Sequence, residues 1–366
     1  MYRPTLDRLA WLLLIAIASA AGTSHAEPLV VSGPTMGTTY HVKLVGVAAA
    51  DAAAIRAEIE AVLADVDERL STYRRDSEVS RFNRAPAGEW FAVSPATVEV
   101  VSTALSISRQ TGGALDVTVG PLVRLWHFGP NAITESKSTA DIAPPDEAAL
   151  QAARKLIGYE KLEVRTDPPA LRKRVDGLEI DLSAVGEGDA IDRVTAAITK
   201  RGIQNYLVEL GGEVRAGGLG PNGSPWRVAV ERPPVVQSPI ERHEMLSTVS
   251  LSNAALATSG DYHRYFEHGS HRYSHVIDPS TGRPVNHALA AVTVAADDAL
   301  TADAWDTALL VLGPKHGYDC AVEHGIAALL ISRAGDAFVT QETPAWKNRF
   351  PTAASSSPAG RRTRSP

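Results

Sequence analysis

Residues 302–307 read Ala302-Asp303-Ala304-Trp305-Asp306-Thr307, directly before a long apolar run. On a helix, the spacing i, i+3 and i+4 places Asp303, Asp306 and Thr307 on one face. Three hard oxygen donors within one turn suit a magnesium ion, and magnesium in turn indicates a substrate that carries phosphates. A second interpretation fits the spacing equally well: Thr301 is an N-cap, and the acidic residues of the first turn interact with the helix dipole.

The rest of the chain mixes strand-like and helical patterns without strict alternation. Apolar residues at helical spacing predict helices over 55–70, 95–110, 146–156 and 189–200. Alternating or apolar runs bounded by Gly, Pro and Asn predict strands over 40–44, 162–164, 177–182, 205–210, 226–230, 247–251 and 291–295. This order favours the α+β class, with mixed or antiparallel sheets and flanking helices. No repeat or Pro- or Ser-rich linker divides the chain, so we expect one catalytic unit with two closely packed halves.

The two ends differ from the rest. Arg3 and Arg8 precede an apolar stretch over 9–18, and residues 24–26 place small side chains where a signal peptidase needs them. The alternative is an uncleaved anchor, but the stretch is about half of the ~20 residues that span a bilayer. We therefore expect a cleaved signal peptide over 1–26, a periplasmic protein with no membrane anchor, and a catalytic domain over 27–350. The last residues, 351–366, predict a disordered tail, and residues 130–145 a polar, irregular connection.

The amino-acid composition limits how the chain can be stabilised and which kinds of partner it can bind. The chain has 366 residues, 44% of them hydrophobic, which suffices for a large core. Its one cysteine, Cys320, cannot close an internal disulfide and is expected to fill space in the core. The formal charge is −6, and removing the net +1 of Arg3, Asp7 and Arg8 leaves −7. An acidic protein is a poor partner for nucleic acid, and it needs a cation to bind an anionic substrate.

Two glycine-containing stretches have to be told apart. Residues 181–188, Asp-Leu-Ser-Ala-Val-Gly-Glu-Gly, follow a predicted strand and open the helix predicted from Asp189. Small residues let a backbone approach a ligand, but Glu187 and Asp189 repel phosphate unless a cation intervenes, which favours a loop beside the metal. An ordinary strand-to-helix turn explains the pattern equally well. Residues 211–218 lie between strand-like segments and predict a hairpin rather than a nucleotide loop.

His275 precedes a tight Asp-Pro-Ser-Thr-Gly turn over 278–282. A neutral imidazole there can accept a proton from a hydroxyl nucleophile, although a lone histidine is more often structural. A zinc site formed with His263, His268 and His271 is disfavoured, because their irregular spacing matches no closed site.

Together these segments resemble the ApbE family, the FAD:protein FMN transferases. The resemblance covers nearly all of the chain beyond the predicted signal. The motifs that carry it lie at 35–38 (Thr-Met-Gly-Thr), 71–77, 113–122, 181–188, 257–262, 274–284 and 302–313.

The resemblance implies an enzyme that splits FAD, releases AMP and attaches FMN through its phosphate to a Thr or Ser hydroxyl of a target protein. It implies that these targets are flavin-accepting subunits of membrane redox complexes outside the cytoplasm. It further implies that Asp303, Asp306, Thr307 and the backbone carbonyl of Ala184 hold magnesium, and that His275 is the catalytic base. The positions that match contacts to the flavin nucleotide are Met36, Tyr73, Ala114, Leu115, Asp116, Asp181, Glu187 and Ile277.

The sequence departs from the family pattern at two neighbouring positions. Many members carry Lys where Glu187 stands, although one branch carries Gly-Glu-Gly as here, and the position of Asp189 is commonly aromatic. The change at Asp189 is expected to affect the nucleotide contacts rather than the reaction class. Two alternatives stay open: a magnesium-dependent FAD pyrophosphatase, and a non-catalytic periplasmic flavin-binding carrier.

Overall fold

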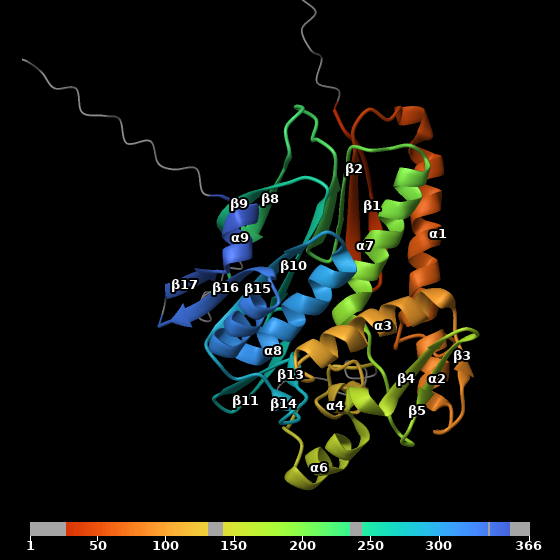
Figure 1. The fold of residues 1–366 in the computed structure, drawn as a ribbon, viewed down its shortest axis with the longest axis vertical. Coiled ribbons are helices and arrows are strands. Elements are labelled where there is room, and N and C mark those ends of the chain that lie inside the picture. The colour runs from red at the N-terminus through yellow and green to blue at the C-terminus, as the bar shows by residue number, and fades with distance from the viewer. Residues whose placement is uncertain (1–26, 131–141, 235–243, 336, 352–366) are drawn as a thin grey trace, which may run out of the picture.

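The computed structural model describes residues 27–130, 142–234, 244–335 and 337–351. An eight-stranded sheet runs through it in the order β1-β2-β6-β7-β10-β15-β16-β17, and every neighbouring pair is antiparallel (Figure 1). The strands are β1 (Leu29–Thr35), β2 (Thr38–Leu44), β6 (Tyr206–Leu210), β7 (Glu213–Gly217), β10 (Ala254–Gly260), β15 (Leu289–Ala296), β16 (Ala327–Ala334) and β17 (Ala337–Glu342). The predicted α+β class with antiparallel pairing is confirmed.

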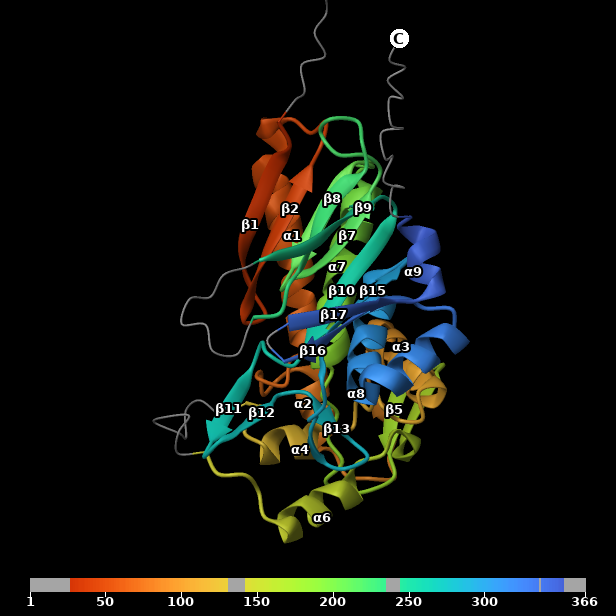
Figure 2. The same cartoon turned by 90° about the vertical axis from the view of Figure 1, so that its left-hand side faces the viewer.

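Both faces of this sheet are covered. Helices α1 (Ala52–Leu70), α7 (Ser183–Lys200) and α8 (Ala299–Glu323) pack on one face, and the hairpin of β8 (Trp226–Glu231) and β9 (Met245–Leu251) and the short helix α9 (Pro344–Arg349) pack on the other (Figures 1 and 2). Because β15 is covered on both sides, its residues are almost all buried, which explains its continuous apolar sequence.

A second group of elements lies beyond the ends of α1 and α7, in the lower half of Figure 1. It contains α2 (Glu78–Arg84), α3 (Pro95–Gln110), α4 (Gly120–Leu125), α6 (Glu147–Leu156), the three-stranded sheet β3-β5-β4 (Phe91–Ala92, Pro169–Lys173, Leu162–Thr166), and the hairpins β11–β12 (Tyr265–His268, His271–Ser274) and β13–β14 (Ile277–Asp278, Arg283–Pro284). Short 3-10 turns lie at Ala49–Asp51 and Tyr159–Lys161. Trp126 ties α4 to the second hairpin, since its indole N–H donates to the carbonyl of Gly282 at 2.8 Å.

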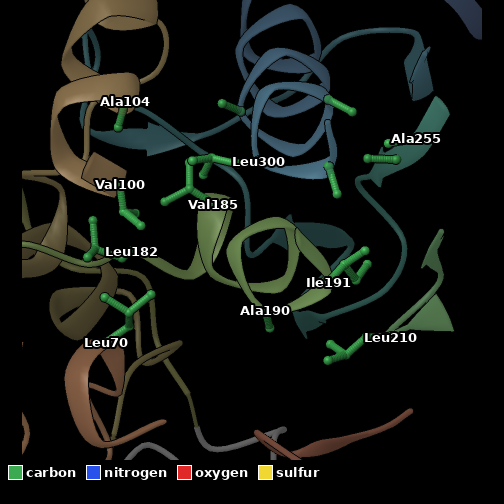
Figure 3. Close-up of a cluster of buried hydrophobic side chains, with 14 of the residues drawn as sticks. Leu70, Val100, Ala104, Leu182, Val185, Ala190, Ile191, Leu210, Ala255 and Leu300 are labelled. Carbon is green, nitrogen blue, oxygen red and sulfur yellow. The ribbon is translucent and has the colours of Figure 1, made fainter. Parts of the chain in front are cut away.

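The core encloses the first half of α7. Figure 3 shows that side chains of α7, among them Val185 and Ile191, face α3, the start of α8 and the large sheet. All of these side chains are buried, and burying each Val, Leu or Ile among them contributes roughly 1.5–3 kcal/mol. The backbone of α7 is therefore held on several sides at the end that carries Ala184 and Glu187.

Helices with strong local signals form where the sequence predicts them. Helix α3 spans Pro95–Gln110, because Ser94 Oγ accepts the N–H of Thr97 and Pro95 occupies the first turn. Helix α6 starts after Asp146, whose side chain accepts the N–H of Ala149. The predicted hairpin after β6 also forms, with Gly211 and Gly212 at φ +66° and +116°.

The strand predicted over 177–182 is wrong. Among the described residues this segment forms one isolated bridge, which joins Glu179 to Val119. The side-chain amide of Asn83 instead takes the place of a neighbouring strand, pairing with the carbonyl and the N–H of Ile180 at 2.9 and 2.8 Å. The alternating apolar pattern therefore reflects burial without sheet pairing.

Helix α7 begins at Ser183, so the predicted loop over 181–188 is wrong beyond its first two residues. The N–H of Ser183 is bound by Asp181 Oδ1 at 2.9 Å, which supports the early start. Gly186 and Gly188, which suggested a loop, lie inside the helix. Gly188 is needed there for packing, because a Cβ on it would lie 2.5 Å from the carbonyl oxygen of Ala299 on α8.

The N-cap of α8 is also different from the one considered. Asp298 accepts the N–H of Thr301 at 2.8 Å, so Thr301 lies within the first turn and is not the cap. The predicted signal over 1–26, residues 352–366 of the predicted tail and residues 131–141 of the predicted connection lie outside the described residues. Among the helices that are described, none is long and apolar enough to cross a membrane.

Candidate functional site

Four carboxylates converge where α7, α8 and β7 meet. Oxygen atoms of Glu213, Asp303 and Asp306 lie within 4.8 Å of one another, and all three side chains are buried. The carboxylate of Glu187 reaches the same place and shares a hydrogen bond with Glu213. So much negative charge away from water is stable only when protons or a cation compensate it.

Burial raises the pKa of Asp303 to about 8, and the charge of Glu187 adds to the effect. Burial also raises the pKa values of Asp306 and Glu213 well above their usual range, with neighbouring carboxylates adding to the effect. Near neutral pH the cluster therefore holds protons unless a cation takes their place.

Two oxygen atoms in the cluster are buried without a hydrogen-bond partner among the described residues: Asp306 Oδ2 and Glu213 Oε2. Leaving a buried charged oxygen unpaired costs at least ~1–3 kcal/mol, so natural proteins seldom keep such atoms without a ligand. Carboxylate oxygens are the donors that magnesium prefers. The donor set therefore fits a divalent cation.

The other polar groups near the cluster keep oxygen lone pairs that can bind the same ion. Ser259 Oγ donates to Asp306 Oδ1 at 3.0 Å and, since its hydrogen is used there, accepts the hydroxyl of Thr307 at 2.8 Å. The lone pairs of Thr307 Oγ1 stay available. The N–H of Gly188, which in a regular helix pairs with the carbonyl of Ala184, donates to Asp303 Oδ2 at 2.9 Å. Because Asp303 also accepts this N–H, the Ala184 carbonyl, one turn earlier on α7, keeps accepting capacity to spare.

The structure thus brings Asp303, Asp306 and Thr307 together, with Ala184 one helical turn before Gly188, which contacts Asp303. The role of these four residues as metal ligands stays a prediction. Sequence reasoning missed Glu213 and Ser259. Ser259 lies in the motif at 257–262, to which the resemblance assigns no ligand, and Glu213 lies in the stretch 211–218, which predicts only a hairpin. The position of Glu213 is set by the strand register of the β6–β7 hairpin, which the sequence alone does not reveal.

His275 follows β12 and is half-buried. Its backbone N–H and its Nδ1 both contact the carbonyl oxygen of Arg264, at 2.9 and 3.0 Å. Since a carbonyl only accepts, Nδ1 carries the proton and Nε2 is left as a proton acceptor. Burial lowers the pKa of His275 to about 4, with His263 adding to the effect, so the ring is neutral at physiological pH.

A pocket of about 640 Å³ lies between the turn after α3, helix α6 and the turn after β13. Two of the predicted nucleotide contacts, Ala114 and Asp116, line it, and Arg154 and Lys155 add positive charge. Asp116 is fixed in place, because its two oxygens accept the N–H groups of Thr118 and Tyr159 at 2.8 and 3.0 Å. A cavity of this size is typical of a small-molecule site.

Of the remaining predicted contacts, three lie in turns or near helix ends, and two are buried in hydrophobic clusters. Met36 lies in the β1–β2 turn at φ +46°, with its Cε 3.8 Å from where a Cβ on Gly186 would stand, and Tyr73 is 60% exposed after α1. Asp181 lies two residues before the start of α7, where its Oδ1 accepts the N–H of Ser183. Leu115 and Ile277, in contrast, are buried in separate hydrophobic clusters, which leaves chiefly their backbone groups for a ligand.

Asp189 does not face the carboxylate cluster. It is 3% exposed and forms ion pairs with Arg193 at 2.8 Å and Arg69 at 3.5 Å. Glu187, two residues earlier, points to a different side of α7 and meets Glu213. The two acidic residues that depart from the family pattern therefore have separate environments.

Known proteins resemble this chain over most of its length. A model of the ApbE family matches residues 36–330. A FAD:protein FMN transferase of Vibrio cholerae is 42% identical over 341 residues, which cover 91% of this chain and 97% of the relative. One from Escherichia coli K12 is 38% identical over 330 residues, covering 90% of this chain and 91% of the relative.

Solved structures show the same likeness. The flavin transferase ApbE from Vibrio cholerae matches with a TM-score of 0.78 at 40% identity, covering 88% of this chain and 99% of that one. The ApbE protein from Thermotoga maritima matches with a TM-score of 0.76 at 27% identity, with the same coverage of 88% and 99%.

Proposed function

The chain belongs to the ApbE family, and from that premise we propose that it is an exported, magnesium-dependent FAD:protein FMN transferase. Its relatives support the coarser statement that it is a flavin transferase. The observation that carries the metal dependence is the buried carboxylate cluster with its two unpartnered oxygens.

Asp303, Asp306, Thr307 and the Ala184 carbonyl are the residues that would hold the ion. When bound, magnesium supplies neutralisation of charge on the phosphates of FAD and on the leaving AMP, usually a large contribution in such transfers. The protein's own contribution is to fix these oxygens on two helices that pack tightly together.

His275 would act on the incoming hydroxyl. Its Nε2 accepts the proton of a Thr or Ser hydroxyl as that oxygen bonds to the phosphorus of the FMN half of FAD. The bond from this phosphorus to the bridging oxygen breaks, and AMP leaves with that oxygen. General-base assistance is worth about 10²- to 10⁴-fold, and the contact from Nδ1 to the Arg264 carbonyl keeps the accepting nitrogen free.

For the nucleotide we propose contacts from two regions. Ala114 and Asp116 line the pocket beside Arg154, whereas Met36 and Glu187 lie near the start of α7. Tyr73, Leu115, Asp181 and Ile277 complete the proposed set.

We further propose export through the segment 1–26, a mature catalytic domain over 27–350 and a periplasmic location. The acceptors would be flavin-accepting subunits of membrane redox complexes. The basic, then apolar, then small-residue pattern of the first 26 residues supports export.

The test is the variant Asp303→Ala, compared with Asp319→Ala, which removes a solvent-exposed carboxylate from the same helix. AMP release and fluorescent labelling of an acceptor peptide are measured with FAD and magnesium. Asp303→Ala should abolish both signals and Asp319→Ala should leave both unchanged. Wild-type rates in Asp303→Ala would show the metal assignment to be wrong.

The same mixture separates the competing functions. A transferase yields a fluorescent peptide, and AMP release then depends on the acceptor. Free FMN formed equally well without the acceptor indicates a pyrophosphatase, and unchanged FAD indicates a binding carrier.

A further inference from the structure

Glu213 is not among the ligands that the family resemblance implies, yet its carboxylate lies inside the carboxylate cluster. Its oxygen is within 4.8 Å of the oxygens of Asp303 and Asp306, and it is 8% exposed. Glu213 Oε2 has no hydrogen-bond partner among the described residues, although Glu187 occupies the neighbouring side of the same carboxylate. A buried, unpaired oxygen aimed into a group of oxygen donors indicates a cation ligand.

The strand register places Glu213 there. In the β6–β7 hairpin Glu213 is paired with Leu210, and directly opposed residues share a face. Leu210 belongs to the core on the helix-covered face, whereas Glu209, one residue earlier, points to the other side. The turn is also closed against Glu187, because a Cβ on Gly211 would lie 2.5 Å from Glu187 Oε2.

We propose that Glu213 is a further ligand of the divalent cation, and that with this third carboxylate the site holds the ion before FAD arrives. This inference rests on the metal dependence proposed above. In an octahedral magnesium site with bonds of ~2.1 Å, opposite ligands are about 4.2 Å apart and neighbouring ligands about 3.0 Å apart. The three oxygens, which lie within 4.8 Å of one another, can therefore bind one ion by moving inward. Three carboxylates also outweigh the charge of a divalent ion without any help from phosphate oxygens.

The experiment measures Mn²⁺ binding to the chelator-stripped, full-length protein without FAD, by electron paramagnetic resonance of the free ion. The variant Glu213→Gln keeps the size of the side chain and one accepting oxygen but removes its charge. Glu209→Gln is the matched control, since it makes the same charge change on the same hairpin and can still accept the N–H of Gly212. We expect Glu213→Gln to weaken Mn²⁺ binding at least tenfold, and Glu209→Gln to stay within twofold of wild type.

Thermal unfolding gives a second readout. Removing one of four crowded, buried carboxylates should raise the Tm of the metal-free protein and shrink the rise in Tm that magnesium causes. If Glu213 only supports Glu187, the metal-free Tm should fall and the magnesium-induced rise should be unchanged, which overturns the proposal. Glu213→Asp, which keeps the charge but shortens the reach, should also bind Mn²⁺ more weakly and covers the case in which the Gln variant does not fold.

Asp303→Ala separates the two levels of inference. Weakened Mn²⁺ binding in Asp303→Ala with unchanged binding in both Glu213 variants overturns only the role of Glu213. Unchanged binding in Asp303→Ala overturns the proposed metal centre as a whole.

Discussion

Replacing Gly188 by alanine should force α7 and α8 apart and damage the metal site. A Cβ at this position would lie 2.5 Å from the carbonyl oxygen of Ala299 and 2.7 Å from the Cα of Leu300. Ordinary contacts begin near 3.4 Å, so the helices must separate by about 0.9 Å, the difference between 3.4 and 2.5 Å. The 2.9 Å hydrogen bond from Gly188 N–H to Asp303 would be stretched by a similar amount.

This displacement is large for a metal centre. Ligand distances in protein metal sites hold to about ±0.2 Å, so a 0.9 Å shift between Ala184 on α7 and Asp303 on α8 should weaken Mn²⁺ binding at least tenfold. Overpacking in a core costs about 1–3 kcal/mol, so the free energy of unfolding should fall by that amount.

Gly186→Ala provides the control on the same helix. Its Cβ would meet only the Cε of Met36, at 3.8 Å, which is an ordinary contact. Because alanine forms helices better than glycine, this variant should gain about 0.5–1 kcal/mol in stability and bind Mn²⁺ like wild type.

The assay pairs urea unfolding with Mn²⁺ titration for the two variants. Equal stability and equal Mn²⁺ affinity of Gly188→Ala and wild type would refute the idea that the close contact of α7 with α8 positions the ligands. Loss of affinity in Gly186→Ala would refute it too, since that change leaves the interhelical contact intact.

The remaining four predictions concern protons. Affinity for magnesium should increase from pH 6 to pH 8, because burial raises the pKa of Asp303 to about 8 and its proton must leave before the ion binds. Calorimetry in buffers of different ionisation enthalpy should detect the released protons. In the metal-free protein the same raised pKa of Asp303 means that the folded state binds more protons than the unfolded state between about pH 4 and 8. The free energy of unfolding should therefore fall as the pH rises from 4 to 8. A magnesium affinity and a free energy of unfolding that do not change with pH would contradict these two expectations. At saturating magnesium, the acidic limb of kcat/KM should lie near pH 4, because burial lowers the pKa of His275 to about 4, and a limb near 6.5 would show that the ring is solvated. His275→Gln should lower kcat about 10²-fold or more while Mn²⁺ binding stays within twofold, and a parallel loss of Mn²⁺ binding would contradict a role confined to proton transfer.

The sequence predicts best what depends on neighbours along the chain. The ends of α3 and α6 follow from a capping residue and apolar spacing, and the face formed by Asp303, Asp306 and Thr307 follows from helix geometry alone. Glu213 could not be found this way, because its place depends on the register of two strands and on which face the helices cover. The early start of α7 was missed for a similar reason: tight packing against Ala299 requires Gly188, so the glycine that suggested a loop is a helix contact.

The departure at Asp189 is best understood as an exchange of one buried interaction for another. Where the family resemblance implies an aromatic residue, this chain buries a carboxylate that pairs with Arg193 and with Arg69, the latter 5% exposed at the end of α1. Breaking a buried ion pair costs about 3–5 kcal/mol because a charge is left uncompensated, so the three residues must change together. The substitution therefore belongs to the contact between α1 and α7, and it affects the site only by holding the helix that carries Ala184 and Glu187.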